Sequence, residues 1–192
     1  MIDLHRISPI TLASRSPQRR AILQQLGITF TVVEPDYDEV DDPGESPDQL
    51  VVTHAVGKCR SVTGLQVLGV DTTVALDGAS LAKPSGSDDA ARMLRMLSGR
   101  RHTVHSGLCL RVGSGEHVRL ASTHVRFREL DEADIAWYVA AGEWQGRAGG
   151  YAVQGVGAAL VTAIEGDYTN VVGLPVAALL DAMAEAQHSV GC

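Results

Sequence analysis

The sequence predicts an α/β protein built on a mixed, twisted sheet with flanking helices. In the first half of the chain, short apolar runs alternate with amphipathic segments, which is typical of parallel strands joined by helices. In the second half, two long extended runs, residues 102–112 and 117–127, are joined by a glycine-rich turn and predict an antiparallel pair. With 192 residues, 45% of them hydrophobic, the chain is expected to form one domain over residues 1–192.

Strands and helices alternate in the first part of the chain. Pro17 and Pro47 each follow a serine, and this pair predicts a helix N-terminus with serine as the cap and proline in the first turn. Gly27 is expected to end the first helix, and Asp71 is expected to end the third strand. The predicted strands are residues 10–13, 30–33 and 67–70.

The later part of the chain carries clear turn and cap signals. Asp77-Gly78 is typical of a hairpin turn, and Asp131 with Asp134 three residues later predicts the start of a helix. The glycine-rich run 146–157 is expected to be a functional loop, because apolar residues continue on both sides of it. The remaining predicted elements are a hairpin of 73–76 and 79–82, a helix over 87–97 capped by Ser87, the two long strands, a helix from 131 to near Gly142, a strand over 160–164 and a helix over 175–186.

Charge and cysteine content exclude several classes of function. The formal net charge of −7 argues against binding of nucleic acid or an anionic membrane by the whole surface, so a phosphate ligand would need a local basic patch. No apolar run reaches the roughly 18 residues that span a bilayer, and the N-terminus lacks the layout of a signal peptide. The three cysteines form no CxxC pair, which is typical of a reducing compartment, so a cytoplasmic protein is expected.

The loop Ser14-Arg15-Ser16 is a candidate anion site. It lies between a predicted strand and a helix N-terminus, where free backbone N–H groups and the helix dipole favour negative charge. Arg19 and Arg20 stand in the first helical turn, where each positive charge opposes the dipole by up to about 1 kcal/mol. A bound phosphate would reverse that penalty. The alternative is that both arginines are solvated on an exposed turn.

Further candidates are an aspartate, two lysines and an acidic run. Asp71, followed by Thr72, stands at the carboxyl end of a predicted strand, where a carboxylate can act as a general base, ligate a hard cation or merely cap a turn. Lys58 and Lys83 are the only lysines among 16 basic residues, which favours sites that need a compact ammonium, although both could be surface residues. One or two carboxylates of residues 36–42 could hold Mg²⁺. The seven histidines show no metal-ligand spacing.

A series of segments, in order along nearly the whole chain, resembles the motifs of the Maf family of nucleoside triphosphate pyrophosphatases. The similar segments are residues 12–23, 38–39, 54–58, 69–74, 83–84, 97–104, 147–155 and 170–175. Two positions depart from the family pattern. Gln18 stands where the opening motif has an arginine, and Arg147 stands where the family usually has a lysine.

The resemblance implies hydrolysis of a nucleoside triphosphate to the monophosphate and pyrophosphate with a divalent metal, Mg²⁺ or Mn²⁺. It also implies a homodimer and a subunit with two lobes around a deep cleft, as in Maf and inosine triphosphatase-like proteins. Thr72 and Gln154 resemble the residues that the family branch acting on dTTP and UTP has at these positions. The alternatives are a pyrophosphatase for 7-methyl-GTP or other modified nucleotides, and a non-catalytic nucleotide-binding regulator of cell division.

The same resemblance assigns roles to individual residues. The implied catalytic residues are Asp71, Lys58, Lys83, Arg19 and Glu39. The implied substrate-binding residues are Ser14, Ser16, Arg20, Thr72 and Gln154. Glu39 and Asp71 would also hold the metal ion, and Asp71 would activate or orient water while the cationic side chains neutralise the triphosphate.

Overall fold

The computed structural model describes residues 9–42 and 44–190. Within these residues, seven strands form one sheet in the order β2-β1-β3-β5-β6-β7, and β4 pairs with β3. The strands are β1 (Ile10–Ala13), β2 (Phe30–Val33), β3 (Gln66–Leu76), β4 (Ala79–Leu81), β5 (Arg101–Val112), β6 (Gly115–Phe127) and β7 (Val161–Glu165). The helices are α1 (Pro17–Gln25), α2 (Pro47–Arg60), α3 (Ser87–Leu97), α4 (Glu132–Ala141), α5 (Tyr168–Val172) and α6 (Val176–Val190), with short 3₁₀ helices η2 (Ala148–Gly150) and η3 (Val156–Leu160).

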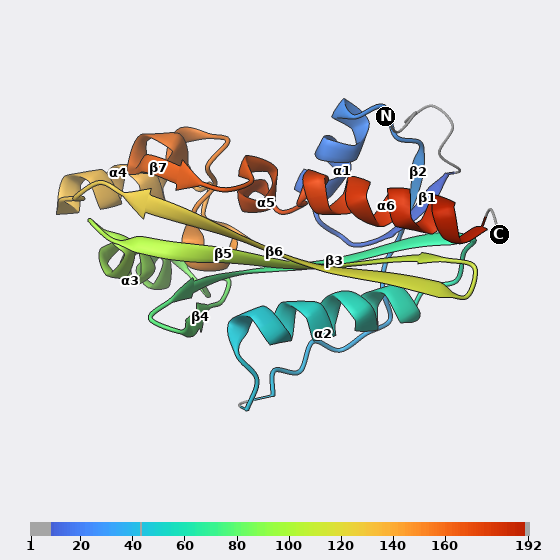
Figure 1. The fold of residues 1–192 in the computed structure, drawn as a ribbon. Coiled ribbons are helices and arrows are strands. Elements are labelled where there is room, and N and C mark those ends of the chain that lie inside the picture. The colour runs from blue at the N-terminus through green and yellow to red at the C-terminus, as the bar shows by residue number, and fades with distance from the viewer. Residues whose placement is uncertain (1–8, 43, 191–192) are drawn as a thin grey trace.

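The sheet is mixed, as the sequence predicted. Strand β1 pairs in parallel with both β2 and β3, whereas β3, β5, β6 and β7 pair antiparallel in turn. The parallel pairing of β1 with β3 ends at Ala13 and Gly69. Beyond that point β3 continues alongside β5 and then β4, so the long strands β3, β5 and β6 run almost the full length of the molecule (Figure 1).

One prediction about the strands is wrong, because Asp71 does not end a strand. It lies in the middle of β3, where it pairs with Gly107 of β5. The sequence suggested two strands because polar residues interrupt the apolar pattern at Asp71, Thr72 and Thr73. In the structure these side chains line a cavity while the backbone ladder continues behind them. Asp71 is still just past the carboxyl end of β1, which places it at the edge of the parallel part of the sheet.

Helix α2 packs directly on β3 and β5, and two glycines permit this close approach. A Cβ atom added to Gly69 would collide with the carbonyl oxygen of Ala55, and one added to Gly107 would collide with that of Val51. Because β3 and β5 have no side chain at these two positions, the backbone of α2 lies directly against the sheet. This contact sets the distance between side chains of α2 and the middle of β3.

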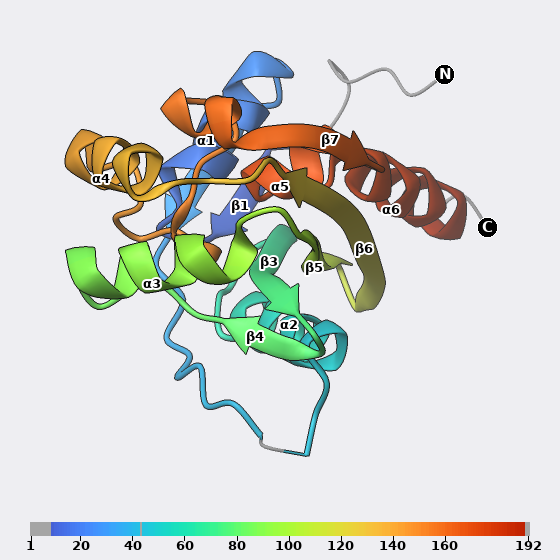
Figure 2. The ribbon, with the colours of Figure 1, turned by 90° about the vertical axis from the view of Figure 1, so that its left-hand side faces the viewer.

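The other helices cover the opposite face and the far end of the sheet. Helices α1, α5 and α6 lie on the face opposite α2 (Figure 1). Helices α3 and α4 contact each other at the far end, near β4 and β7 (Figure 2). This arrangement agrees with the predicted α/β class with flanking helices on a mixed sheet.

Two large apolar cores lie along the sheet, one at each end, and a smaller third cluster lies where α2 meets the sheet. The first joins β1, α1, α6 and the nearer halves of β3 and β5, with Leu12, Leu23, Leu68 and Leu179 at its centre. The second joins α3, α4, the farther halves of β3, β5 and β6, and the start of the glycine-rich run; its buried members include Leu94, Val104, Phe127, Tyr138 and Tyr151. The two cores correspond to the two lobes that the sequence led us to expect.

Most helix and turn signals are confirmed. Ser16 and Ser46 are the N-caps of α1 and α2, and Asp131 caps α4 by accepting a hydrogen bond from the backbone N–H of Asp134. Gly27, just after α1, has a positive φ of 68°, as expected for a residue that ends a helix. The turn at Asp77 and Gly78 has the two positive φ angles, 53° and 80°, of a tight hairpin.

Three details differ from the sequence prediction. Ser87 lies inside α3, and Gly86 occupies the cap position. The glycine-rich run 146–157, which was predicted to be a functional loop, lines the cavity but also contains turns, η2 and the start of η3. The short helix α5 was not predicted at all. None of the helices in the described chain is both long and apolar enough to cross a membrane.

Candidate active site

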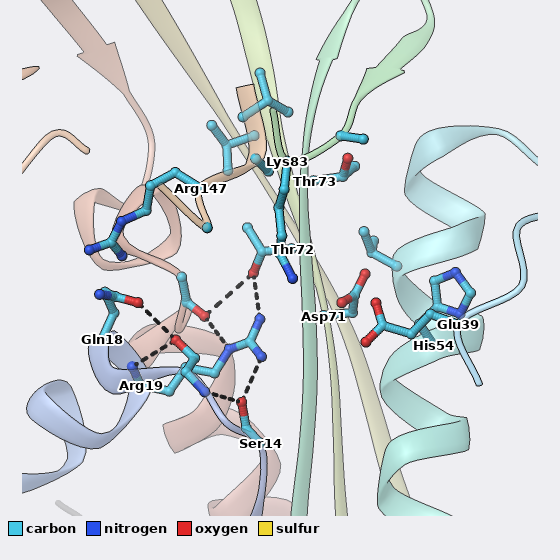
Figure 3. A pocket seen from close by; sticks show the side chains of 18 of the residues that line it. Ser14, Gln18, Arg19, Glu39, His54, Asp71, Thr72, Thr73, Lys83 and Arg147 are labelled. Carbon is cyan, nitrogen blue, oxygen red and sulfur yellow. Dashed lines mark hydrogen bonds between the residues drawn. The ribbon is translucent and has the colours of Figure 1, made fainter. Parts of the chain in front are cut away.

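A cavity of about 610 Å³ opens between the two cores, within the size range of small-molecule sites. Its walls come from the loop after β1, the start of α1, the segment before α2, one face of α2, the middle of β3, the end of the β3–β4 hairpin and the glycine-rich run (Figure 3). Nine of the ten residues predicted for the site line it: Ser14, Ser16, Arg19, Glu39, Lys58, Asp71, Thr72, Lys83 and Gln154. The tenth, Arg20, is exposed and is not among the lining residues.

The centre of one wall is an ion-paired cluster of one lysine and two carboxylates. Lys58 Nζ lies 2.6 Å from Asp71 Oδ1 and 2.9 Å from Glu39 Oε1. The Lys58 side chain, on α2, is only 7% exposed, and the close packing of α2 on β3 brings it to Asp71. Burial alone would raise the pKa of Glu39, but the hydrogen bond and positive charge of Lys58 outweigh this effect, so the pKa is lowered. Glu39 is therefore held in its ionised form.

The two carboxylates fit a single hard cation whose remaining ligands come from elsewhere. Mg²⁺ usually takes one or two carboxylates and completes its shell with phosphate oxygens and water. Glu39 and Asp71 both contact the ammonium group of Lys58, so they lie close enough together to be candidate ligands of one metal ion. The described residues contain no cluster of three or more His, Cys, Asp or Glu side chains suited to a metal. The arrangement thus suits a cation that arrives with a phosphate ligand rather than an all-protein metal cage.

Arg19 connects three segments beneath the floor of the cavity. Its Nε donates to the carbonyl oxygen of Gly173 at 2.9 Å, and its terminal nitrogens donate to Ser14 Oγ at 3.0 Å and Thr72 Oγ1 at 3.1 Å (Figure 3). Burial lowers the pKa of Arg19, and the negative charges of Asp71 and Glu39 oppose this shift. Within the described residues no carboxylate is bonded to this side chain, so it brings an unneutralised positive charge to the floor of the cavity.

Besides Ser14, two more of the predicted substrate-binding groups are already engaged by the protein. The hydroxyl of Thr72 accepts from Arg19 and also lies 2.8 Å from Ser106 Oγ. The hydroxyl of Ser16 accepts from the backbone N–H of Arg19 as the cap of α1 and donates to the Gln18 side chain. The structure therefore gives Thr72 and Ser16 a part in shaping the site, which the sequence had not distinguished from direct contact with a ligand.

Lys83 and Arg147 are the unpaired cations of the cavity. Among the described residues, neither side chain makes a hydrogen bond or an ion pair, and the buried Nε of Arg147 has no acceptor. Burial also lowers the pKa of Arg147. An unsatisfied buried donor costs about 1–3 kcal/mol, so an acceptor from a ligand would be stabilising at this position. Gln154, on the same glycine-rich run, lines this cavity and an adjoining apolar one of about 460 Å³.

The sequence singled out His54 only within the segment 54–58 and Asp41 only within the acidic run 36–42, and it did not connect either of them with Tyr37. His54, on α2, is buried, and its two ring nitrogens contact Tyr37 and Asp41 from the segment that carries Glu39. The available signal was the spacing of His54 and Lys58, since residues four apart share one face of a helix. The partners could not be recognised, because nothing in the local sequence pairs them with the helix.

An α/β protein whose cleft brings four cationic side chains to a pair of carboxylates belongs to the class that binds or transforms small anionic ligands. A family model described as Maf-like protein matches residues 9–186, and the chain belongs to that family. It is 46% identical over 184 residues to the dTTP/UTP pyrophosphatase of Anaeromyxobacter sp. (strain Fw109-5), covering 93% of this chain and 90% of that protein. It is 43% identical over 187 residues to the dTTP/UTP pyrophosphatase of Pelotomaculum thermopropionicum, covering 94% of this chain and 98% of that protein.

Two solved structures are similar over part of the chain. A HAM1 protein from Coxiella burnetii aligns with a TM-score of 0.44 and 16% identity, over 63% of this chain and 73% of that chain. The Ham1 protein of Staphylococcus aureus aligns with a TM-score of 0.45 and 13% identity, over 62% of this chain and 72% of that chain.

Proposed function

We propose that this protein hydrolyses nucleoside triphosphates, dTTP and UTP in particular, to the monophosphate and pyrophosphate. The observation that carries the proposal is the cluster in which Lys58 joins Asp71 to Glu39 inside a cleft that also holds Arg19, Lys83 and Arg147. This arrangement offers both a base and the positive charge that a triphosphate requires. The names of the relatives, dTTP/UTP pyrophosphatase, support the same activity.

In the proposed mechanism, Asp71 receives the proton of the attacking water. Its Oδ1 is held by Lys58, so Oδ2 is available to accept that proton as the water oxygen bonds to the α-phosphorus. The bond from the α-phosphorus to the bridging oxygen breaks, and pyrophosphate leaves. A divalent ion held by Glu39 and Asp71 would supply Lewis-acid neutralisation of the phosphate charge.

The cationic side chains would bind the remaining phosphate oxygens. Lys83 and Arg147 have no protein partner among the described residues, so their full hydrogen-bonding capacity is available to the β- and γ-phosphates. Arg19 uses three of its five N–H donors on protein oxygens, which leaves two for the substrate. Ser14, fixed by Arg19 at the loop after β1, lies where a phosphate oxygen would meet the helix N-terminus.

The base specificity is assigned to Gln154. Its amide is exposed and offers a donor and an acceptor, which can read the imide edge of thymine or uracil. The adjoining apolar cavity that Gln154 also lines gives a planar base a wall to pack against. Thr72 would contribute indirectly, since its hydroxyl is engaged by Arg19 and Ser106.

The experiment is a comparison of kcat/KM for dTTP, UTP, CTP, GTP, ITP and 7-methyl-GTP at one concentration of Mg²⁺ or Mn²⁺, with pyrophosphate release as the readout. We expect dTTP and UTP to be best and purine triphosphates to be poorer by at least about tenfold, because an unpaired polar edge in the base site is costly. A clear purine preference would contradict the base assignment alone. No pyrophosphate release from any nucleotide, with or without metal, would contradict the enzymatic activity itself.

A cytoplasmic homodimer is proposed on the same resemblance. Cys59 and Cys109 are free thiols, as is usual in a reducing compartment. Light scattering on the protein as it elutes from a size-exclusion column gives the mass of the assembly directly. A mass of one chain at micromolar concentration would contradict the dimer.

A further inference from the structure

The segment that carries Glu39 is fastened to α2 through one imidazole. His54 is only 3% exposed, and its Nε2 lies 3.0 Å from Asp41 Oδ1 while its Nδ1 lies 3.1 Å from the Tyr37 hydroxyl. Tyr37 and Asp41 stand two residues before and two residues after Glu39. A single side chain of the helix therefore holds both sides of the residue that contacts Lys58.

The hydrogen bonds around His54 determine its tautomer. A carboxylate can only accept, so Nε2 must carry the proton that is donated to Asp41. In the neutral ring Nδ1 is then an acceptor, and the Tyr37 hydroxyl donates to it. The position thus requires one donor and one acceptor on opposite sides of a buried ring, a requirement that an apolar side chain of similar size cannot meet.

Helix α2 is shaped to receive this segment. A Cβ atom on Gly57 would collide with the ring of Tyr37, so the glycine provides the space in which the ring packs against the helix. The rings of Tyr37 and His54 meet edge to face, with centroids 5.9 Å apart. Gly57 and Lys58 come three and four residues after His54, so the tyrosine, the imidazole and the ammonium lie on one side of the helix.

Apart from its own ion pair with Lys58, Glu39 depends on these contacts for its position. Residues 34–42 form no helix or strand, and the Glu39 side chain is 45% exposed. A ligand that had to fix an unrestrained segment would also have to offset the backbone conformational entropy that the segment loses. The hydrogen bonds of His54 remove much of that freedom before any ligand binds.

We propose that His54, Tyr37 and Asp41 form a positioning site that sets the affinity of the active site for its divalent cation by holding Glu39 beside Asp71. The inference rests on the proposed function, in which Glu39 and Asp71 hold that cation. None of the three residues needs to touch the cation or the nucleotide. Partners of this kind, one step away from a metal ligand, typically contribute 10- to 100-fold in metal affinity.

The test compares variants that break the contacts with variants that keep them. His54→Leu and Asp41→Ala remove the pairing, whereas Asp41→Asn keeps an acceptor for Nε2. Asp36→Ala is the matched control, because Asp36 is an exposed acid of the same segment, is not one of the two residues that bond His54, and its loss changes the charge equally. Binding of Mn²⁺ alone is measured by electron paramagnetic resonance, and the Mg²⁺ concentration for half-maximal turnover is measured in parallel.

His54→Leu and Asp41→Ala should weaken Mn²⁺ binding and raise the Mg²⁺ half-saturation point by roughly tenfold. At saturating Mg²⁺, kcat should stay within about threefold of the parent protein, because the reacting groups are intact. Asp41→Asn should lie near the parent, and Asp36→Ala should not differ from it. If His54→Leu fails to fold, the comparison with the parent protein is made with Asp41→Ala and Tyr37→Phe. These two residues are more exposed than His54, so their replacement disturbs the core less.

Unchanged metal affinity in the folded variants would overturn the proposal, as would a loss of kcat that saturating metal does not restore. Glu39→Gln separates this failure from failure of the proposed function. If Glu39→Gln weakens Mn²⁺ binding and the His54 and Asp41 variants do not, only the positioning role is wrong. If Glu39→Gln has no effect on Mn²⁺ binding, the assignment of Glu39 to the metal is wrong, and the positioning proposal fails with it.

Discussion

Asp71 and Lys58 show how one residue's role depends on its partner. The 2.6 Å hydrogen bond from Lys58 fixes the orientation of the Asp71 carboxylate, and the surrounding β3–β5 ladder fixes its backbone. A carboxylate held in this way can accept a proton without first having to be oriented. The same hydrogen bond balances part of the charge that would otherwise be left inside the cleft.

Asp71→Asn should lower turnover by roughly 100- to 10,000-fold, because the amide keeps the size of the side chain but cannot take a proton from water. Nucleotide affinity, measured by calorimetry, should change far less than kcat. Asp77→Asn is the control, since Asp77 is an exposed aspartate of the hairpin turn whose partner is Arg100. Turnover of Asp71→Asn within about threefold of the parent would contradict the role as base.

Sequence patterns located residues of the cavity where the signal lies in neighbouring positions of the chain. They missed residues whose partners come from distant parts of the chain. The loop after β1, both lysines and Asp71 were all singled out, and the structure brings them to one cavity. His54 was passed over, because its partners are 13 and 17 residues away and the pairing exists only after α2 docks on the sheet. Arg20 shows the reverse: its position in the first helical turn suggested a ligand contact, but the turn directs it to solvent.

At the level of elements, the position of α2 on the sheet controls the geometry of the cluster. Gly107→Ala should destabilise the fold by about 1–3 kcal/mol, because its Cβ would collide with the backbone of α2 at Val51 and force the helix outward. Since Gly107 pairs directly with Asp71, the same displacement should separate Lys58 from Asp71 and lower kcat. Urea unfolding and pyrophosphate release measure the two effects on one sample.

Gly115→Ala provides the comparison for this variant. Its added Cβ would make only ordinary van der Waals contacts, and Gly115 lies at the start of β6. We expect its unfolding free energy to stay within roughly 1 kcal/mol of the parent. Equal effects of Gly107→Ala and Gly115→Ala would show that the close approach of α2 has no special importance.

The elements themselves were predictable where local signals agree with the tertiary structure. The serine and aspartate caps, the Asp77-Gly78 turn and the long antiparallel strands all follow from local residue preferences. Helix α5 could not be predicted, because its residues, YTNVV, favour strands. Tertiary contacts override that preference: Asp167 caps the helix, and buried Asn170 donates to Val104 O and Thr123 Oγ1.

At the level of the whole molecule, a buried histidine couples stability of the second core to pH. His102 Nε2 lies 2.8 Å from the Tyr151 hydroxyl, and both rings pack edge to face with Phe127. Burial lowers the pKa of His102 to about 4, whereas an unfolded histidine titrates near 6.5. Between these values the unfolded chain takes up a proton that the folded protein does not, so stability is fully present above pH 6.5 and declines as the pH falls towards 4.

The contribution over this window amounts to up to about 3 kcal/mol, because the pKa of His102 is about 4 in the folded protein and 6.5 in the unfolded chain. His102→Gln cannot titrate but retains a donor and an acceptor for Tyr151, so its unfolding free energy should fall less between pH 7 and pH 4.5. Groups shared by both proteins cancel in the difference between the two urea-unfolding profiles. Parallel profiles over this pH range would contradict the prediction.

The continuous strands under both cores have a mechanical consequence. Strand β3 is in register with β5 from Gln66 to Ala75, and β5 is in register with β6 from Arg101 to Val112, so one stiff ladder spans the cleft from end to end. Opening the cleft about a hinge would shear this ladder and break backbone hydrogen bonds in the middle of the sheet. We therefore expect entry and exit of a ligand to depend on residues 34–42 and on the glycine-rich run at the rim more than on a change in the width of the cleft. A preformed cleft of constant width spends little of the binding free energy on closure.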